Sequence, residues 1–455
     1  MDDPLDFELQ DDLLVPLPIN KKRKKVIGLD DLLNEHYKEQ EKLAEKQKKQ
    51  AKKKAKANEK KKYDDEDRKE AHLNRLVEKC HNQLKAFGEE NEIPVWGVEV
   101  FGEQKPFPRL DFPDLGSCNF IQSFLNNRLN SVVELAADKG DSFLEGLLVN
   151  GWLSKLAFLS GHVEKPVALW AFNSMLYSSK EELQNSSSDF WCEILSSGNE
   201  ADQFSVKVDW FPEYKDLRSA LDTYGFLFKF SSSAAHESSD SNNGGPPQNI
   251  RAWIRFVTYC CRIKSKKAIL STIEAEEIVE IIICMFLDRR FQGLLVLLYD
   301  CLQAVVDYFT DQEWCSSCEN VAKFIACRVS EDLNCIRTVE CVSEDSSRCR
   351  QLRSAIAYQT MLFCFDGANN GEEILKSLDA INLKHKSCDF FKLYIHLVLA
   401  KNWILSNNSV EDNEVIHEMF CSFLRNCSTF ISPTDLRSYA SEVRHKASYL
   451  LNFSV

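Results

Sequence analysis

Glycine and proline are both scarce in this chain, with 16 and 12 residues among 455. A β-sandwich or another turn-rich architecture needs these residues at its turns, so their scarcity argues against such a fold. The hydrophobic content of 44% is enough for a sizeable core. The composition therefore favours an all-α protein with one or two domains.

The sequence also lacks the local motifs of the common enzyme classes. Its sparse glycines, such as Gly140 with Gly146 and Gly367 with Gly371, follow no predicted strand and do not form a phosphate-binding loop. The Gly-x-Ser-x-Gly, His-Glu-x-x-His and protein-kinase motifs are absent as well. We therefore expect a protein that is not an enzyme, with no cofactor and no small-molecule substrate.

Long apolar runs are missing too. The longest, Ile281 to Leu287, is far too short to span a bilayer. The first residues, Met-Asp-Asp-Pro, are acidic and do not resemble a secretory signal peptide. These two features predict a soluble intracellular protein that does not bind membranes. In a reducing compartment, the 17 cysteines are expected to be free thiols, mostly in the core.

One local cysteine pair has metal-site spacing, Cys315-Ser-Ser-Cys318. A structural zinc site needs a second close pair of Cys or His ligands, and Cys341 and Cys349 are eight positions apart. No histidine occurs between His236 and His385. We therefore favour buried thiols on one helical face over a zinc site or a redox pair at Cys315 and Cys318, and predict no metal. The isolated His162 and His396 are interpreted as structural histidines with hydrogen-bond partners.

Charge divides the chain into three parts. Residues 1–20 carry six acids and no base, and their alternating apolar residues are typical of a disordered tail. Residues 21–62 contain 17 Lys and Arg against 7 Asp and Glu, although the whole chain has a net charge of −13. We predict a basic, helix-prone arm over residues 21–92 and a helical region over residues 93–455. This polarity is typical of a nuclear protein that docks onto other macromolecules.

Two short motifs in the basic arm predict binding. A run of five cations suits an acidic import receptor, with a generic basic patch as the alternative; it consists of Lys21, Lys22, Arg23, Lys24 and Lys25. Apolar residues at helical spacing follow and are predicted to dock in a partner's groove; they are Leu29, Leu32, Leu33 and Tyr37. The charged stretch 38–62 lacks the apolar stripe of a self-sufficient coiled coil. It is either a non-specific DNA contact or a solvated spacer.

Apolar residues recur at helical spacing along most of the C-terminal region. Residues 143–156 form one such stripe, and Ile278–Leu287, Leu294–Phe309 and Phe390–Leu405 are predicted to be buried helices. Residues 93–116 are expected to be extended chain over the first helices. The Ser-, Gly- and Pro-rich stretch 231–249 predicts a disordered loop. Successive helices without a strict repeat suggest an irregular HEAT-like α-solenoid.

Helix starts are marked by capping residues. Ser271 with Glu274, and Thr310 with Glu313, match the capping-box pattern, in which the cap and third helical residues satisfy each other's backbone N–H groups. Ser432 followed by Pro433 predicts another helix start, with proline at the first helical position.

One part of the sequence resembles a known family. The segments Val167–Met175, Phe190–Leu195, Trp210–Leu217 and Tyr224–Phe226 are similar to the CANIN domain of partners of the DNA-repair SMC complex (structural maintenance of chromosomes, Smc five/six type). The shared pattern in these segments is an apolar helix with Trp and Phe, a helix with a central Trp, and a Trp-x-Pro-x-x-x-Asp-Leu sequence that enters a helix. The resemblance covers roughly residues 90–330 and continues more weakly to the end of the chain. The residues that carry it are Trp170, Phe172, Trp191, Trp210, Pro212, Asp216 and Leu217.

The resemblance implies a non-enzymatic scaffold or loader with a nuclear location. Within the family the chain is most similar to the plant type, the counterpart of the Nse-six and SMC-localisation-factor subunits. Its partners would be SMC-complex subunits and a second helical subunit of the Nse or SNI type, and its role would be recruitment to damaged chromatin for double-strand-break repair. The alternative is a helical adaptor of another nuclear complex, in RNA processing or ubiquitin ligation.

Overall fold

The computed structural model divides the chain into two units, Met1–Glu90 and Asn91–Val455, and we call the second the body. The first unit contributes few described residues. The ranges that the structure describes are 38–46, 48, 75, 77–78, 96–114, 118–119, 121–122, 140–196, 206–229, 245–263, 269–406 and 413–453.

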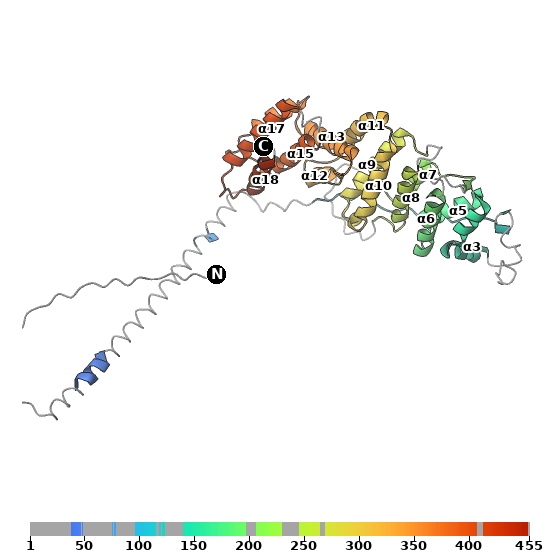
Figure 1. Ribbon diagram of the computed structural model, residues 1–455, viewed down its shortest axis with the longest axis horizontal. Coiled ribbons are helices and arrows are strands. Elements are labelled where there is room, and N and C mark those ends of the chain that lie inside the picture. The colour runs from blue at the N-terminus through green and yellow to red at the C-terminus, as the bar shows by residue number, and fades with distance from the viewer. Residues whose placement is uncertain are drawn as a thin grey trace, which may run out of the picture. The chain divides into compact units, whose positions relative to one another are not determined.

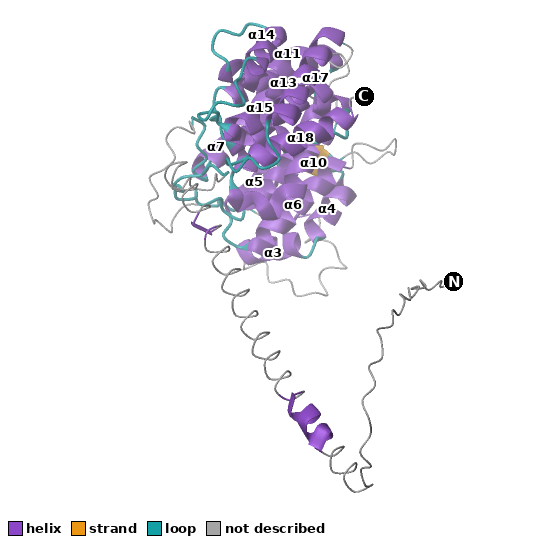
Figure 2. Cartoon of the chain, turned by 90° about the vertical axis from the view of Figure 1, so that its left-hand side faces the viewer, coloured by secondary structure: helices purple, strands orange, loops and turns teal. Residues whose placement is uncertain are grey.

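The named elements of the described chain are nearly all helical (Figure 1). The helices are α3 (Gly140–Val149), α4 (Trp152–Ser160), α5 (Lys165–Tyr177), α6 (Glu181–Ser196), α7 (Tyr214–Thr223), α8 (Ile250–Arg262), α9 (Thr272–Leu287), η4 (Arg289–Leu294), α10 (Leu295–Tyr308), α11 (Asp311–Ala326), α12 (Leu333–Glu340), α13 (Ser347–Cys364), α14 (Gly371–Asp379), α15 (Phe390–Leu405), α17 (Glu414–Phe430) and α18 (Ala440–Phe453). Strands β1 (His162–Val163) and β2 (Lys207–Val208) form a short parallel pair. Figure 2 shows how little of the described chain is strand. The predicted all-α class is confirmed.

Each helix of the body packs mainly against helices close to it in sequence. The contacts lead from α5 and α6 through α8, α10, α9, α11, α13 and α15 to α18 and α17. Within the body, α3 and α5 lie at one end and α17 and α18 at the other (Figure 1). Helix formation and core packing thus depend largely on neighbouring segments, because each helix has an apolar face that the next one covers. The HEAT-like form of this stack stays a prediction.

Several predicted elements agree with the structure in detail. Helix α15 has the predicted bounds, and all of Ile278–Leu287 except Glu280 is buried in α9. Both capping boxes, at Ser271 and Thr310, form. The apolar stripe over 143–156 is two helices rather than one, because Gly151 adopts a left-handed conformation that ends α3 and begins α4.

The predicted helix start at Ser432 is wrong. Residues 432–439 form turns, and α18 begins at Ala440. Arg437 explains the difference, because its guanidinium pairs with Asp435 and donates to the backbone oxygens of Leu383 and His385. These long-range bonds hold the segment as a loop against the chain between α14 and α15.

An extended segment, residues 96–114, crosses several helices, and we call it the strap. Its backbone N–H groups donate to acceptors far along the sequence. The pairs are Gly97 with Asn334 Oδ1 (2.6 Å), Val98 with the Leu287 oxygen (2.9 Å), Gly102 with the Gly225 oxygen (2.8 Å) and Lys105 with the Thr223 oxygen (2.8 Å). The strap therefore begins on α12 and passes the C-terminal ends of α9 and α7.

Aromatic side chains fix the rest of the strap. Phe101 packs on Phe226 and Phe291, with ring centroids 5.3 and 5.5 Å apart. Further along, Phe107 contacts Tyr177 and Phe112 contacts Trp170, both in α5. The expectation that this segment covers the first helices holds for Phe107 and Phe112. It was incomplete for Trp96 to Phe101, whose contacts lie in the middle of the body.

Asp288 anchors the strap. This carboxylate is only 3% exposed, accepts the Val100 N–H at 3.2 Å and pairs with the Arg290 guanidinium at 2.6 Å. Arg290 in turn donates to the Phe101 oxygen. This ion pair at the end of α9 therefore also holds the strap.

Glycine is required where the strap passes α7. Gly225 has a φ of +84°, and a Cβ there would lie 2.5 Å from the backbone oxygen of Glu103. Only glycine combines this conformation with so close a backbone approach.

The predicted loop 231–249 is only partly described. Residues 230–244 lie outside the described residues. Asn249, at the end of the stretch, is buried and donates to the backbone oxygens of Met175 and Ser178. The chain is thus part of the packed body by the start of α8.

One described stretch passes a length and composition test for a membrane-spanning helix. It is Arg289–Tyr308, with a mean hydropathy of 1.2 over its most apolar part, 39% of which is buried. It comprises η4 and α10, and α10 packs on α8, α9 and α13. Core helices of soluble proteins pass the same test, so this is weak support for a membrane span.

Candidate interaction surface

The predicted binding residues of the arm fall outside the described chain. These are the import motif Lys21, Lys22, Arg23, Lys24 and Lys25, and the docking residues Leu29, Leu32, Leu33 and Tyr37. The charged helix is described from Lys38 to Lys46, where it is helical and exposed.

The residues that carry the family resemblance lie together in the core. Phe172 makes edge contacts with Trp191, Trp210 and Phe256, with ring centroids 6.3, 5.5 and 5.4 Å apart. Pro212 is buried, and Asp216 closes a capping box at the start of α7. Trp170 and Leu217 are also buried. Trp210 and Asp216 are partly exposed, and the other residues that carry the resemblance are buried in the core.

The cysteines are free thiols throughout the described chain, and twelve of the sixteen described are buried. Cys318 is one of them, and burial raises the pKa of its thiol to about 12. Cys315 is exposed, so the prediction that both thiols are buried on one helical face was wrong for Cys315. Among the described residues, no third His, Cys, Asp or Glu joins this pair in a group that could hold a metal.

The first helices of the body expose large apolar side chains. Trp152 and Leu159 on α4 are 50% and 84% exposed, and Val149 at the end of α3 is also exposed. Trp152 and Leu159 are seven positions apart, which places them on one face of the helix. The Lys155 ammonium lies 4.6 Å from the centre of the Trp152 ring. We call Val149, Trp152 and Leu159 the α4 surface.

Exposed single apolar residues are common in soluble proteins, whereas grouped ones mark interfaces. Tryptophan is prominent at protein interfaces because it buries a large area at low cost in conformational entropy. The opposite end of the body also exposes apolar side chains; they are Val415, Phe430, Leu436 and Tyr449. Exposed apolar side chains also occur between the two ends, at Ile273, Val296 and Phe363.

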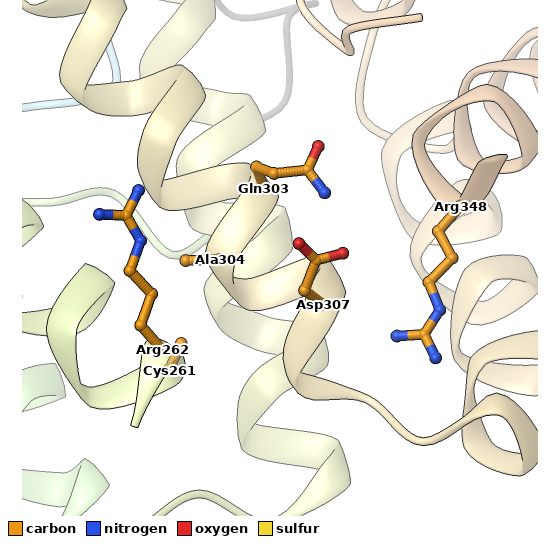
Figure 3. A pocket seen from close by; sticks show the side chains of 6 residues that line it. All are labelled: Cys261, Arg262, Gln303, Ala304, Asp307 and Arg348. Atoms are coloured by element: carbon orange, nitrogen blue, oxygen red, sulfur yellow. The ribbon is translucent and has the colours of Figure 1, made fainter. Parts of the chain in front are cut away.

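A polar cavity of about 520 Å³ lies between α8, α10 and α13 and is shown in Figure 3. The Asp307 side chain lies between those of Arg262 and Arg348 in this view. Arg348 donates to the backbone oxygens of Val306 and Phe309 at the end of α10 and pairs with Asp311. Burial raises the pKa of the Cys261 thiol well above its ordinary value. Arg348 thus joins the start of α13 to the end of α10, and the raised pKa makes Cys261 a poor nucleophile.

Glu280 is the carboxylate with the largest upward pKa shift in the described chain. Burial in α9 raises its pKa to about 8, and Glu276 and Glu277 add to the shift while Arg328 opposes it. The folded state thus binds this proton more tightly than the unfolded state does. The stability that this contributes is complete below about pH 4.5 and is lost as the pH rises toward 8.

We expect the Glu280→Gln variant to be more stable than wild type at pH 8 by about 1 to 2 kcal/mol, a figure reduced for the partial exposure of the side chain. At pH 4.5 the two proteins should be equally stable. Urea unfolding at both pH values measures the difference. The exposed Glu193→Gln variant of α6 is the control, and a gain for Glu280→Gln that is the same at both pH values would contradict the assignment.

Three donors of different types meet near α12, α13 and α15. Glu331, Cys364 and His396 each place one ligand-type atom within 4.8 Å of the others. His396 Nε2 lies 2.6 Å from Glu331 Oε1, and Lys392 Nζ lies 3.0 Å from Glu331 Oε2. The prediction that His396 has a hydrogen-bond partner is confirmed, as it is for His162, which pairs with Asp209 at 2.8 Å. Sequence reasoning did not connect His396 with Cys364.

Comparison of the chain with protein-family models finds no match, and comparison with curated proteins finds none either. The resemblance to the CANIN domain therefore rests on the quoted residues alone.

Proposed function

We propose that this protein is a non-enzymatic scaffold subunit. It binds a second helical subunit and recruits or regulates the DNA-repair SMC complex on chromatin. The observation that carries the scaffold role is the α4 surface, where a tryptophan and a leucine project from one face of a helix at the end of the body. The finer identity of the partners comes from the family resemblance.

The α4 surface suits a helical partner. Residues seven apart on one helix present the spacing at which two packed helices interlock their side chains. Burial of the exposed parts of Trp152, Leu159 and Val149 would be favourable, at about 25 cal/mol per Å² of apolar surface. Lys155 beside the Trp152 ring adds a cation at the rim, where charges set orientation more than affinity.

The arm supplies the other proposed contacts. Its five-residue basic run would direct nuclear import, and the surrounding lysines would contact DNA phosphates without sequence preference. The body carries the excess of acidic residues, so it is suited to a protein partner rather than to DNA.

Affinity purification of the full chain from nuclease-treated nuclear extract tests this function. We expect the SMC pair and one further helical subunit to be recovered, and the further subunit to fall by about tenfold or more with the double variant Trp152→Ser and Leu159→Ser. Val296→Ser, which alters an isolated and strongly exposed residue of α10, is the matched control.

Two outcomes would count against the proposal, and they are distinguishable. Recovery of an RNA-processing or ubiquitin-ligase complex in place of the SMC subunits would overturn the family assignment but keep the scaffold role. Unchanged recovery of every partner with the double variant would remove the α4 surface as the docking site.

A further inference from the structure

Glu331, Cys364 and His396 bring three kinds of metal-ligand atom to one place. Glu331 lies in the turn before α12, Cys364 is the last residue of α13 and His396 is in the middle of α15. Their donor atoms are mutually within 4.8 Å. Among the described residues, no other group of three or more such side chains meets this criterion.

The distances suit a small ion. Two ligands on one tetrahedral zinc ion, with bonds of about 2.0 to 2.3 Å, lie roughly 3.3 to 3.7 Å apart. His396 Nε2 and Glu331 Oε1 are now 2.6 Å apart, which is a hydrogen-bond distance. For an ion to bind between these two atoms, they would have to move apart by less than about 1 Å. Glu331 stays oriented, because Lys392 holds its second oxygen.

A cavity borders the histidine of this group. A cavity of about 360 Å³ borders His396 and Lys392 and is otherwise lined mainly by the turn between α14 and α15. His396 is itself buried, and among the described residues its Nδ1 atom has no hydrogen-bond partner. Zinc would bind at the other ring nitrogen, Nε2, which faces Glu331.

We propose that Glu331, Cys364 and His396 bind one zinc ion, with water in the fourth position, and that the ion ties α15 to the end of α13 and the start of α12. Sulfur and imidazole donors select zinc over magnesium or calcium, which prefer all-oxygen sites. A thiolate and a carboxylate balance the charge of Zn²⁺, which makes its burial tolerable. Binding releases the Cys364 proton to water.

The test uses the purified full chain, stripped of metal by a chelator under reducing conditions. Titration with Co²⁺ should give one equivalent bound, with a thiolate-to-cobalt charge-transfer band, and Zn²⁺ should displace the cobalt. Cys364→Ser and His396→Gln should each weaken zinc binding by more than about 100-fold in competition with a chromophoric chelator. Cys315→Ser is the matched control and should bind zinc as wild type does.

A measurement on the wild-type chain covers the case in which a variant does not fold. Zinc at a hundredfold excess over its dissociation constant should raise Tm by roughly 4 °C. The proposal is overturned if zinc leaves Tm unchanged and no stoichiometric cobalt spectrum appears. It is equally overturned if binding survives in Cys364→Ser and is lost in Cys315→Ser, because the ion would then belong to the Cys315 and Cys318 pair.

Discussion

The Asp288→Ala variant should lose about 3 to 5 kcal/mol of unfolding free energy. The buried carboxylate accepts the Val100 N–H and pairs with Arg290, so its removal leaves the buried Val100 N–H without this acceptor and takes the Asp288 counter-charge from Arg290, which keeps its bond to the Phe101 oxygen. Removing one member of a buried ion pair costs more than replacing both members by apolar residues, because the remaining charge stays partly desolvated after its counter-charge is gone. Chemical denaturation measures the loss, and hydrogen exchange at Val98 and Gly102 should show the strap opening first.

Asp300→Ala is the matched control, because Asp300 is an exposed aspartate on the neighbouring α10. It should change stability by less than about 0.5 kcal/mol. If Asp288→Ala lost no more than this control, or if the strap amides stayed protected, Asp288 would not be the anchor described above.

The Trp191→Ala variant should lose about 4 kcal/mol. Trp191 is fully buried, and its ring touches Phe172, Phe211 and Phe256, which come from α5, the segment before α7, and α8. Truncation at this position opens a cavity that four rigidly packed segments cannot close. Thermal and urea unfolding of the full chain measure the effect.

Two comparisons separate cavity formation from other causes. Trp191→Phe should cost much less, because the indole N–H makes no hydrogen bond to any described residue. Trp152→Ala, at a half-exposed tryptophan, should change stability by about 1 kcal/mol or less. Equal losses in Trp152→Ala and Trp191→Ala would rule out the core role assigned to Trp191.

Local features of the fold were readable from the sequence. The bounds of α15 and the capping boxes at Ser271 and Thr310 follow from apolar spacing and from hydrogen bonds within four residues. The same logic failed at Ser432, where the cap pattern is present but Arg437 binds backbone oxygens more than fifty positions away. A capping pattern therefore predicts a helix start only where no residue distant in the sequence binds the same segment.

The candidate functional residues likewise include some with a local sequence pattern and some without one. Cys315 and Cys318 carry a recognisable local spacing, yet only Cys318 is buried. Glu331, Cys364 and His396 have no spacing signal, since 33 and 32 positions separate them, and only the packing of α12, α13 and α15 brings them together. The α4 surface lay within the apolar stripe over 143–156, which the structure divides into α3 and α4 at Gly151, and Trp152 at the start of α4 is half exposed.

The strap also fixes an order of events during synthesis. Gly97 is made early, but its acceptor, Asn334, is 237 residues further on. At ordinary translation rates this delay is on the order of tens of seconds. Helices that pack on their sequence neighbours can form meanwhile, whereas Val98, Val100 and Phe101 must wait without their final contacts. The N-terminal edge of the body is therefore the first part of the body to leave the ribosome, yet it closes only after α12 has been made, and this interval is when a chaperone or an assembly partner engages it.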